Sequence, residues 1–202
     1  MEKHIYIMFS HTNTKIGKII QFFSNYTYNH VSISVDSSLQ PLYSFARYHY
    51  NAALVGGFVE ESPLRYIWDG RDTTIRIYDL VISEEQFKKF EIIISLYSKK
   101  STQYIYDHFY FFRKDTCRSK YQHTCLSFVV DILKDLQILP NDTKIKTIKA
   151  LTTALSCFPY TDTKLYRESD TQYTWGNDKY YENIPLPNIF VSTCQHFRKL
   201  IS

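Results

Sequence analysis

The chain has 202 residues, of which 44% are hydrophobic and 22% charged, with only five glycines and six prolines. This composition is typical of a globular domain with a core and excludes a disordered chain. The net charge of +4 is spread along the sequence, and its densest basic run, residues 144–149, holds three lysines on an expected helix. Such a run is usually a solvated face, so we expect no nucleic-acid binding.

The N-terminal stretch is not expected to be a secretory signal. The first apolar run spans about five residues, shorter than the roughly 7 to 15 that a secretory signal needs. No other stretch approaches the roughly 20 apolar residues of a membrane span. We therefore expect a cytoplasmic location and a single domain over residues 1–202, with a core at about 4–138 and a less regular C-terminal cover over 140–202.

The first third of the chain predicts strands around one helix. "HIYIMF" is apolar on both faces and predicts a central strand. Residues 13–23 show helical spacing, while "HVSISVD" alternates like a half-buried strand. After turn residues 36–39, "QPLYSFAR" predicts the returning strand of a hairpin. His30 and Ser44 are therefore expected on adjacent strands.

The middle of the chain predicts more strands and a capped helix. A loop over residues 47–57 ends in Gly56-Gly57, a short strand is expected at residues 58–59, and "TTIRIYDL" predicts another. Ser83 and Gln86 form a capping-box pattern before a helix with one apolar stripe. That stripe consists of Phe87, Phe90, Ile94 and Tyr97.

A second helix follows an aromatic segment, residues 104–125, that favours no particular element. "CLSFVVDILKDLQIL" has helical spacing, places Cys125 in the first turn and is stopped by Pro140. A short helix is expected within residues 143–156. The remainder, with Pro185 and Pro187, predicts an irregular cover.

The cysteines predict free thiols and no metal site. They are Cys117, Cys125, Cys157 and Cys194. None forms a C-x-x-C pair, and a reducing compartment keeps such cysteines reduced. The alternative is a metal site formed by Cys117, His123 and Cys125 with His108. Zinc sites, however, use tightly spaced pairs of ligands that this sequence lacks. We expect no metal and no cofactor.

The position of Cys125 favours chemistry at this thiol. If Thr124 or His123 caps the helix, Cys125 lies near its first residue, where free N–H groups favour a thiolate and can receive an oxyanion. A nucleophilic thiol needs an imidazole, and the chain has seven histidines. His30 begins a strand that can pair beside this helix, whereas His123 would point away. Buried cysteines and strand histidines are, however, more often core residues.

Four segments, in order, resemble one family. "IIQFFSNYTYNHVSISVD", "LYSFAR", "GGFVEE" and "HTCLSFVVDIL" are similar to the circularly permuted NlpC/P60 hydrolases, papain-like folds whose histidine strand precedes the cysteine helix. Within them the chain resembles the YiiX-like group of uncharacterised bacterial proteins. The similarity covers about residues 4–138, with His30 and Cys125 95 residues apart.

The resemblance implies an α+β fold, an antiparallel sheet packed against a helix that bears the nucleophile Cys125, with His30 as general base. The third catalytic position, a glutamate in relatives, falls on Ser44. A serine orients an imidazole but does not balance its charge, so Glu60 or Glu61 is the alternative source of a carboxylate. Leu126 and Ser127 also depart from the small polar pair usual after the cysteine.

The resemblance implies a thiol hydrolase or acyltransferase that cleaves an amide, ester or thioester of a peptide or acyl substrate. The family includes cell-wall endopeptidases and resembles lipid acyltransferases of the lecithin:retinol type. The alternative, favoured by Ser44, is a catalytically silent papain-like scaffold that binds or regulates a partner. Aromatic residues either line a substrate groove or, as is more usual at this density, fill the core. They are Tyr28, Tyr104, Tyr106, Phe109, Tyr110, Phe111 and Phe112.

Overall fold

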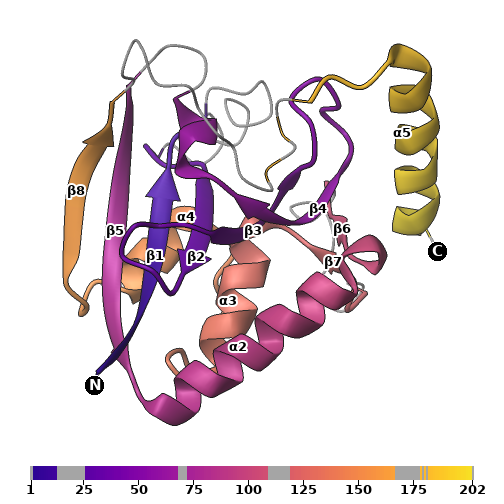
Figure 1. Cartoon of the computed structure of the whole chain (residues 1–202). Helices are drawn as coiled ribbons and strands as arrows, with labels where there is room; N and C mark the ends of the chain where they lie inside the picture. The colour runs from indigo at the N-terminus through magenta and orange to yellow at the C-terminus, as the bar shows by residue number, and fades with distance from the viewer. Residues whose placement is uncertain are drawn as a thin grey trace.

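The computed structural model describes residues 2–12, 26–67, 72–108, 119–166, 178, 180 and 182–201. Its centre is a six-stranded antiparallel sheet in the order β4-β3-β2-β1-β5-β8 (Figure 1). The strands are β1 (Lys3–Ser10), β2 (His30–Ser34), β3 (Leu42–Arg47), β4 (Gly56–Glu61), β5 (Thr73–Ile82) and β8 (Tyr160–Leu165). The α+β class is therefore confirmed.

Helices and a small second sheet surround this centre. The described helices are α2 (Glu84–Lys99), α3 (Cys125–Asp135), α4 (Ile148–Ala154), α5 (Leu186–Ile201) and the short 3-10 helices η1 (Pro63–Tyr66) and η2 (Ser101–Gln103). Strands β6 (Ile105–Tyr106) and β7 (Gln122–His123) pair in parallel just before α3. Within the described residues, no helix is long and apolar enough to cross a bilayer.

Strand β1 is central, as its apolar sequence predicts. It pairs with β2 on one side and β5 on the other, and its residues from Ile7 to Ser10 are buried on both faces. Ile7 and Phe9 belong to the main core with α2, α3 and α4, whereas Met8 packs on the opposite face with Leu42 and Tyr66.

The hairpin of β2 and β3 is confirmed, but the half-buried pattern expected for β2 is wrong. Ile33 pairs with Tyr43, and all five residues of β2 are buried. Ser32 is fully buried because η1 and the end of β4 cover its face, where it contacts Glu61 and Tyr66. The serines of β2 therefore lie in a polar interior and not at the surface.

Helices α2 and α3 start where the sequence predicts. Ser83 and Gln86 make the two reciprocal hydrogen bonds of a capping box at α2, and Phe90 and Ile94 are buried. At α3, Thr124 is the capping residue, and most of the helix is buried in the main core. The helix expected at residues 13–23 lies outside the described residues.

The expectation of an irregular C-terminal cover is wrong for the described residues. Strand β8 pairs with β5 from Thr73 to Tyr78 and forms one edge of the sheet, with mostly exposed side chains. Helix α5 lies beyond β4 at the other side of the molecule (Figure 1). Pro187 falls in its first turn, where a missing N–H breaks no helical bond. Pro185 therefore precedes the helix and Pro187 lies in its first turn, so neither proline excludes a helix.

Candidate active site

Cys125 is the first residue of α3, and its position follows from a local capping box. The Thr124 Oγ1 accepts a hydrogen bond from the Ser127 N–H at 3.1 Å, and the Ser127 Oγ accepts one from the Thr124 N–H at 2.9 Å. These bonds occupy two of the four N–H groups at the helix start that have no helical partner. Within the described residues the N–H groups of Cys125 and Leu126 have no hydrogen-bond acceptor, so they could receive a developing oxyanion beside the thiol.

His30, the first residue of β2, lies between the thiol and a carboxylate. Its Nε2 is 2.9 Å from Oε1 of Glu61 and 3.3 Å from Oγ of Ser44, and Cys125 is close enough for its charge to act on the ring. Because Nε2 donates to Glu61, Nδ1 is the nitrogen left to face the sulfur. His30 and Cys125, distant in sequence, are therefore neighbours in the fold.

The charges around His30 favour its protonated form. Burial alone would lower the pKa of His30, since it disfavours an imidazolium. The charge of Glu61 and then that of Cys125, together with their hydrogen bonds, outweigh burial and raise the pKa of His30 to about 10. At neutral pH the ring is therefore an imidazolium, a form that favours a thiolate next to it.

Glu61 is the residue that charges and orients His30, and Ser44 has a lesser role. The hydroxyl of Ser44 donates to the carbonyl oxygen of Val31 at 3.0 Å, so its proton is already used. The carboxylate makes the shorter contact, and a charged acceptor binds more strongly than a hydroxyl. Ser44 does lie beside His30, as expected, but the missing negative charge comes from Glu61.

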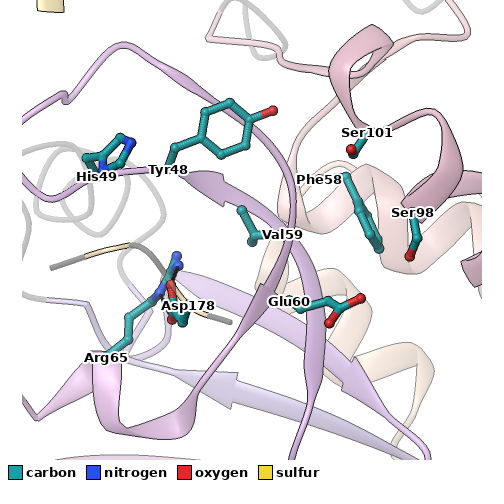
Figure 2. A pocket seen from close by; sticks show the side chains of 9 residues that line it. All are labelled: Tyr48, His49, Phe58, Val59, Glu60, Arg65, Ser98, Ser101 and Asp178. Carbon is teal, nitrogen blue, oxygen red and sulfur yellow. Dashed lines mark hydrogen bonds and ion pairs between the residues drawn. The ribbon is translucent and has the colours of Figure 1, made fainter. Parts of the chain in front are cut away.

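Glu60, the other glutamate considered from the sequence, is not part of this group. Adjacent strand residues point to opposite faces. Figure 2 shows Glu60 on the side of β4 with Phe58 and Ser98, away from Arg65 and Asp178. Of the two neighbouring carboxylates, only Glu61 contacts His30.

Buried polar groups hold the carboxylate of Glu61 in place. Its Oε1 accepts hydrogen bonds from the hydroxyl of Tyr66 at 2.6 Å and from the hydroxyl of Ser32, and its Oε2 is 3.2 Å from Nη1 of Arg65. Burial would raise the pKa of Glu61, but His30 and then Arg65 outweigh it and lower the pKa to about 2. Glu61 is therefore ionised throughout the physiological range.

The other histidines close to Cys125 in sequence have structural contacts. The ring of His123 lies 4.9 Å from that of Phe45, and its Nε2 is 3.0 Å from the carbonyl oxygen of Lys120. His123 is thus packed in the core, in agreement with the expectation that it does not serve the thiol. His108 contacts the carbonyl oxygen of Leu54.

No described cluster suggests a metal centre. Among the described residues, no three histidine, cysteine, aspartate or glutamate side chains are arranged to hold a metal ion. Cys125, Cys157 and Cys194 are free thiols, the first buried and the other two exposed. Cys117 lies outside the described residues.

The aromatic residues divide between core and site. Tyr28 is buried and its ring lies 6.3 Å from that of Phe9, while the ring of Tyr104 lies 4.4 Å from that of Tyr97. Burial, and after it the charge of Cys125, raises the pKa of Tyr106, so this phenol lies near the thiol. Residues 109–112 lie outside the described residues.

Sequence reasoning missed Ser32, Tyr66, Arg65 and Asp178. A local signal exists for Arg65 and Tyr66. In "ESPLRY", Ser62 caps η1 and Pro63 opens it, which predicts a turn at these residues. This turn returns the chain over β4 so that Arg65 comes back to Glu61, four residues earlier. Nothing near Asp178 in the sequence indicates that it reaches the same place.

Two clefts lie along β4. One, of about 440 Å³, is lined by residues including Phe58, Glu60, Arg65 and Asp178 (Figure 2). The other, of about 650 Å³, lies between β4 and α5. Neither is lined by Cys125, which is only 5% exposed. The thiol is therefore buried and does not line either of these clefts.

No family model, curated protein or solved structure matches this chain. The contacts of Cys125, His30 and Glu61 are consequently the observations from which its chemistry is inferred.

Proposed function

We propose that this protein is a cysteine hydrolase or acyltransferase, of the circularly permuted NlpC/P60 type, that acts on an amide, ester or thioester. The observation that carries the proposal is the position of His30, beside a thiol at a helix N-terminus and hydrogen-bonded to a buried, ionised glutamate. This order of thiol, imidazole and carboxylate is the arrangement that activates a nucleophile.

In the first half of the reaction, the thiolate of Cys125 attacks the carbonyl carbon of the substrate and forms a carbon–sulfur bond. The carbonyl oxygen becomes an oxyanion, which the N–H groups of Cys125 and Leu126 stabilise. His30 donates its proton to the leaving amine, alcohol or thiol as the bond to it breaks. An S-acyl intermediate remains on Cys125.

In the second half, His30, now neutral, removes a proton from water or from another acceptor. That nucleophile attacks the thioester carbon, and the sulfur leaves as a thiolate. Glu61 keeps Nε2 of His30 protonated throughout, so that Nδ1 exchanges the proton. A peptide or acyl conjugate fits this chemistry, with water giving hydrolysis and another acceptor giving acyl transfer.

The alternative function is a silent papain-like scaffold that binds or regulates a partner. Its support in the sequence is Ser44, which replaces a carboxylate at the third position. The contact of Glu61 with His30 supplies that carboxylate and removes this support. The geometry therefore favours the enzyme.

Competitive alkylation tests the proposal. Iodoacetamide is added at about pH 6, where an ordinary thiol is almost entirely protonated, and the modified cysteines are quantified by mass spectrometry. Exposure alone would favour Cys157 and Cys194 over the buried Cys125. We expect Cys125 to react first, and His30→Ala to abolish this preference.

Acyl and peptidyl electrophiles then test turnover, with Cys125→Ala as the blank and Cys157→Ala as the matched control. Uniformly slow labelling of all cysteines would favour the silent scaffold. Equal labelling of the native chain and His30→Ala would remove His30 from the proposed pair.

A further inference from the structure

A second carboxylate, that of Asp178, lies behind the Glu61 group and has no role in the steps above. Its Oδ2 accepts hydrogen bonds from Nε of Arg65 at 2.9 Å and from the Ser62 N–H at 3.1 Å. Its Oδ1 contacts Nη2 of the same guanidinium. Asp178 and Arg65 are both buried, and Figure 2 shows the two side chains together at the cleft beside β4.

Arg65 thus lies between two carboxylates, since its Nη1 is also 3.2 Å from Glu61. The three side chains together carry one net negative charge. Without the charge of Asp178, the guanidinium would neutralise Glu61 and the group would be neutral. His30 is in direct contact with this group, so the presence of Asp178 changes the field at the imidazole.

Other titratable or charged groups facing this cluster do not replace Asp178. The hydroxyl of Tyr66 contacts Glu61 and that of Tyr180 accepts from Arg47 at 2.6 Å. Burial raises the pKa of both tyrosines, so they are neutral at physiological pH. Arg47 contributes a further positive charge, which disfavours a protonated His30. The negative charge of Asp178 opposes this effect.

Asp178 comes from a C-terminal segment that attaches to the loop after β3. The N–H of Tyr50 donates to the carbonyl oxygen of Tyr180 at 2.8 Å, and Nδ2 of Asn51 donates to that of Ile184 at 2.9 Å. Tyr180 and Ile184 are thus attached to this loop, and Asp178, two residues before Tyr180, binds Arg65. The C-terminal part of the chain therefore completes the charge environment of a site built from its first two thirds.

We propose that Asp178 is a positioning residue that, through Arg65 and Glu61, holds His30 as the imidazolium partner of Cys125. This inference rests on the proposed function, because it assigns Asp178 a role in preparing the thiolate–imidazolium pair. It predicts that the net charge of Glu61, Arg65 and Asp178, and not merely their packing, affects how strongly His30 holds its proton.

The test is the pKa of His30 in the full-length chain, measured by NMR titration of ¹⁵N-labelled imidazoles. The His30 signal is assigned by its loss in His30→Gln. Asp178→Asn makes the group neutral and should lower the pKa of His30 by about one unit, the effect expected of one nearby charge in a protein. Arg65→Gln leaves two carboxylates and should raise it.

The double variant Arg65→Gln with Asp178→Asn restores one net negative charge and should return the pKa of His30 toward the native value. Replacing a buried ion pair by neutral partners of similar shape is also tolerated better than removing one charge. Far-UV circular dichroism identifies the folded variants, and Asp135→Asn, at the far end of α3, is the charge-matched control.

Opposite shifts in the two single variants, or a native-like pKa in the double variant beside a lowered one in Asp178→Asn, support the proposal. A shift of the same sign in both single variants, or no shift in any folded variant, overturns it. Alkylation of Cys125 in the native chain is measured in parallel. If Cys125 is alkylated selectively but the pKa of His30 does not change in the variants, the role of Asp178 is contradicted and the proposed function is not. If alkylation is unselective in the native chain, the proposed function itself is contradicted.

Discussion

At the scale of single residues, the choice of the third member of the site depends on which group can carry a charge. Ser44 and Glu61 both lie within hydrogen-bonding distance of Nε2 of His30. A hydroxyl that donates to a backbone carbonyl holds the ring by contact only, whereas the carboxylate also favours the protonated ring.

Substitution of each residue should therefore have unequal effects. Glu61→Gln keeps the shape of the side chain and removes its charge, so the imidazolium–thiolate pair should lose about 1.4 kcal/mol of stabilisation, and the rate of Cys125 alkylation at about pH 6 should fall about tenfold. Ser44→Ala should change that rate by less than about threefold. Mass-spectrometric time courses compare the two variants, and a larger loss in Ser44→Ala would make the serine the orienting group.

The sequence places Cys125 at a helix start and His30 beside Ser44 because both depend on local patterns. A capping sequence indicates the helix start, and a turn between two alternating segments indicates the hairpin. It cannot choose between Glu60 and Glu61, because β4 reads "GGFVEE", with no alternation of polar and apolar residues that marks its inner face. The register of β4 against β3 decides this, and register is a tertiary property.

At the scale of elements, the cap of α3 links stability to the site. Thr124→Ala removes the acceptor for the Ser127 N–H, and loss of such a cap costs about 1 kcal/mol in the free energy of unfolding. Thr147 caps α4 in the same way, through the Ala150 N–H at 3.1 Å, so Thr147→Ala is a matched control.

Both variants should lose similar stability in urea unfolding, but only Thr124→Ala should also slow the alkylation of Cys125, because only this cap orients the N–H groups next to the thiol. Equal alkylation rates in the two variants would show that the helix start does not act on the sulfur.

The local sequence predicts some elements of this fold better than others. Helix α2 carries both its cap and its apolar stripe within a few residues, and it was predicted correctly. Strand β8 reads "YTDTKL" and is mostly exposed, so it has no apolar pattern. Its strand conformation depends on hydrogen bonding to β5, a partner more than 80 residues away, which no local pattern reveals.

At the scale of the whole molecule, the buried charges of the site should make stability depend on pH. The folded protein raises the pKa of His30 from 6.5 to about 10. Its contribution is therefore complete below about pH 6.5 and is lost as the pH rises through about 10. Glu61, lowered from 4.5 to about 2, contributes fully above about pH 4.5 and loses its contribution as the pH falls toward 2.

The free energy of unfolding should accordingly be highest between about pH 4.5 and 6.5 and should fall on both sides. Urea unfolding over this range measures it, and His30→Gln should remove much of the decline on the alkaline side. An alkaline decline that is the same in His30→Gln and in the native chain would show that the imidazole does not cause it.

The position of β8 at the sheet edge also bears on how molecules of this protein meet one another. Asp162 and Lys164 stand on that strand with exposed side chains, and an edge carrying charges resists addition of a strand from a neighbouring chain. A polar last strand thus protects the apolar strands behind it from intermolecular sheet growth. The polar sequence of β8, which lacks the apolar pattern of a strand, thus keeps the sheet confined to one molecule.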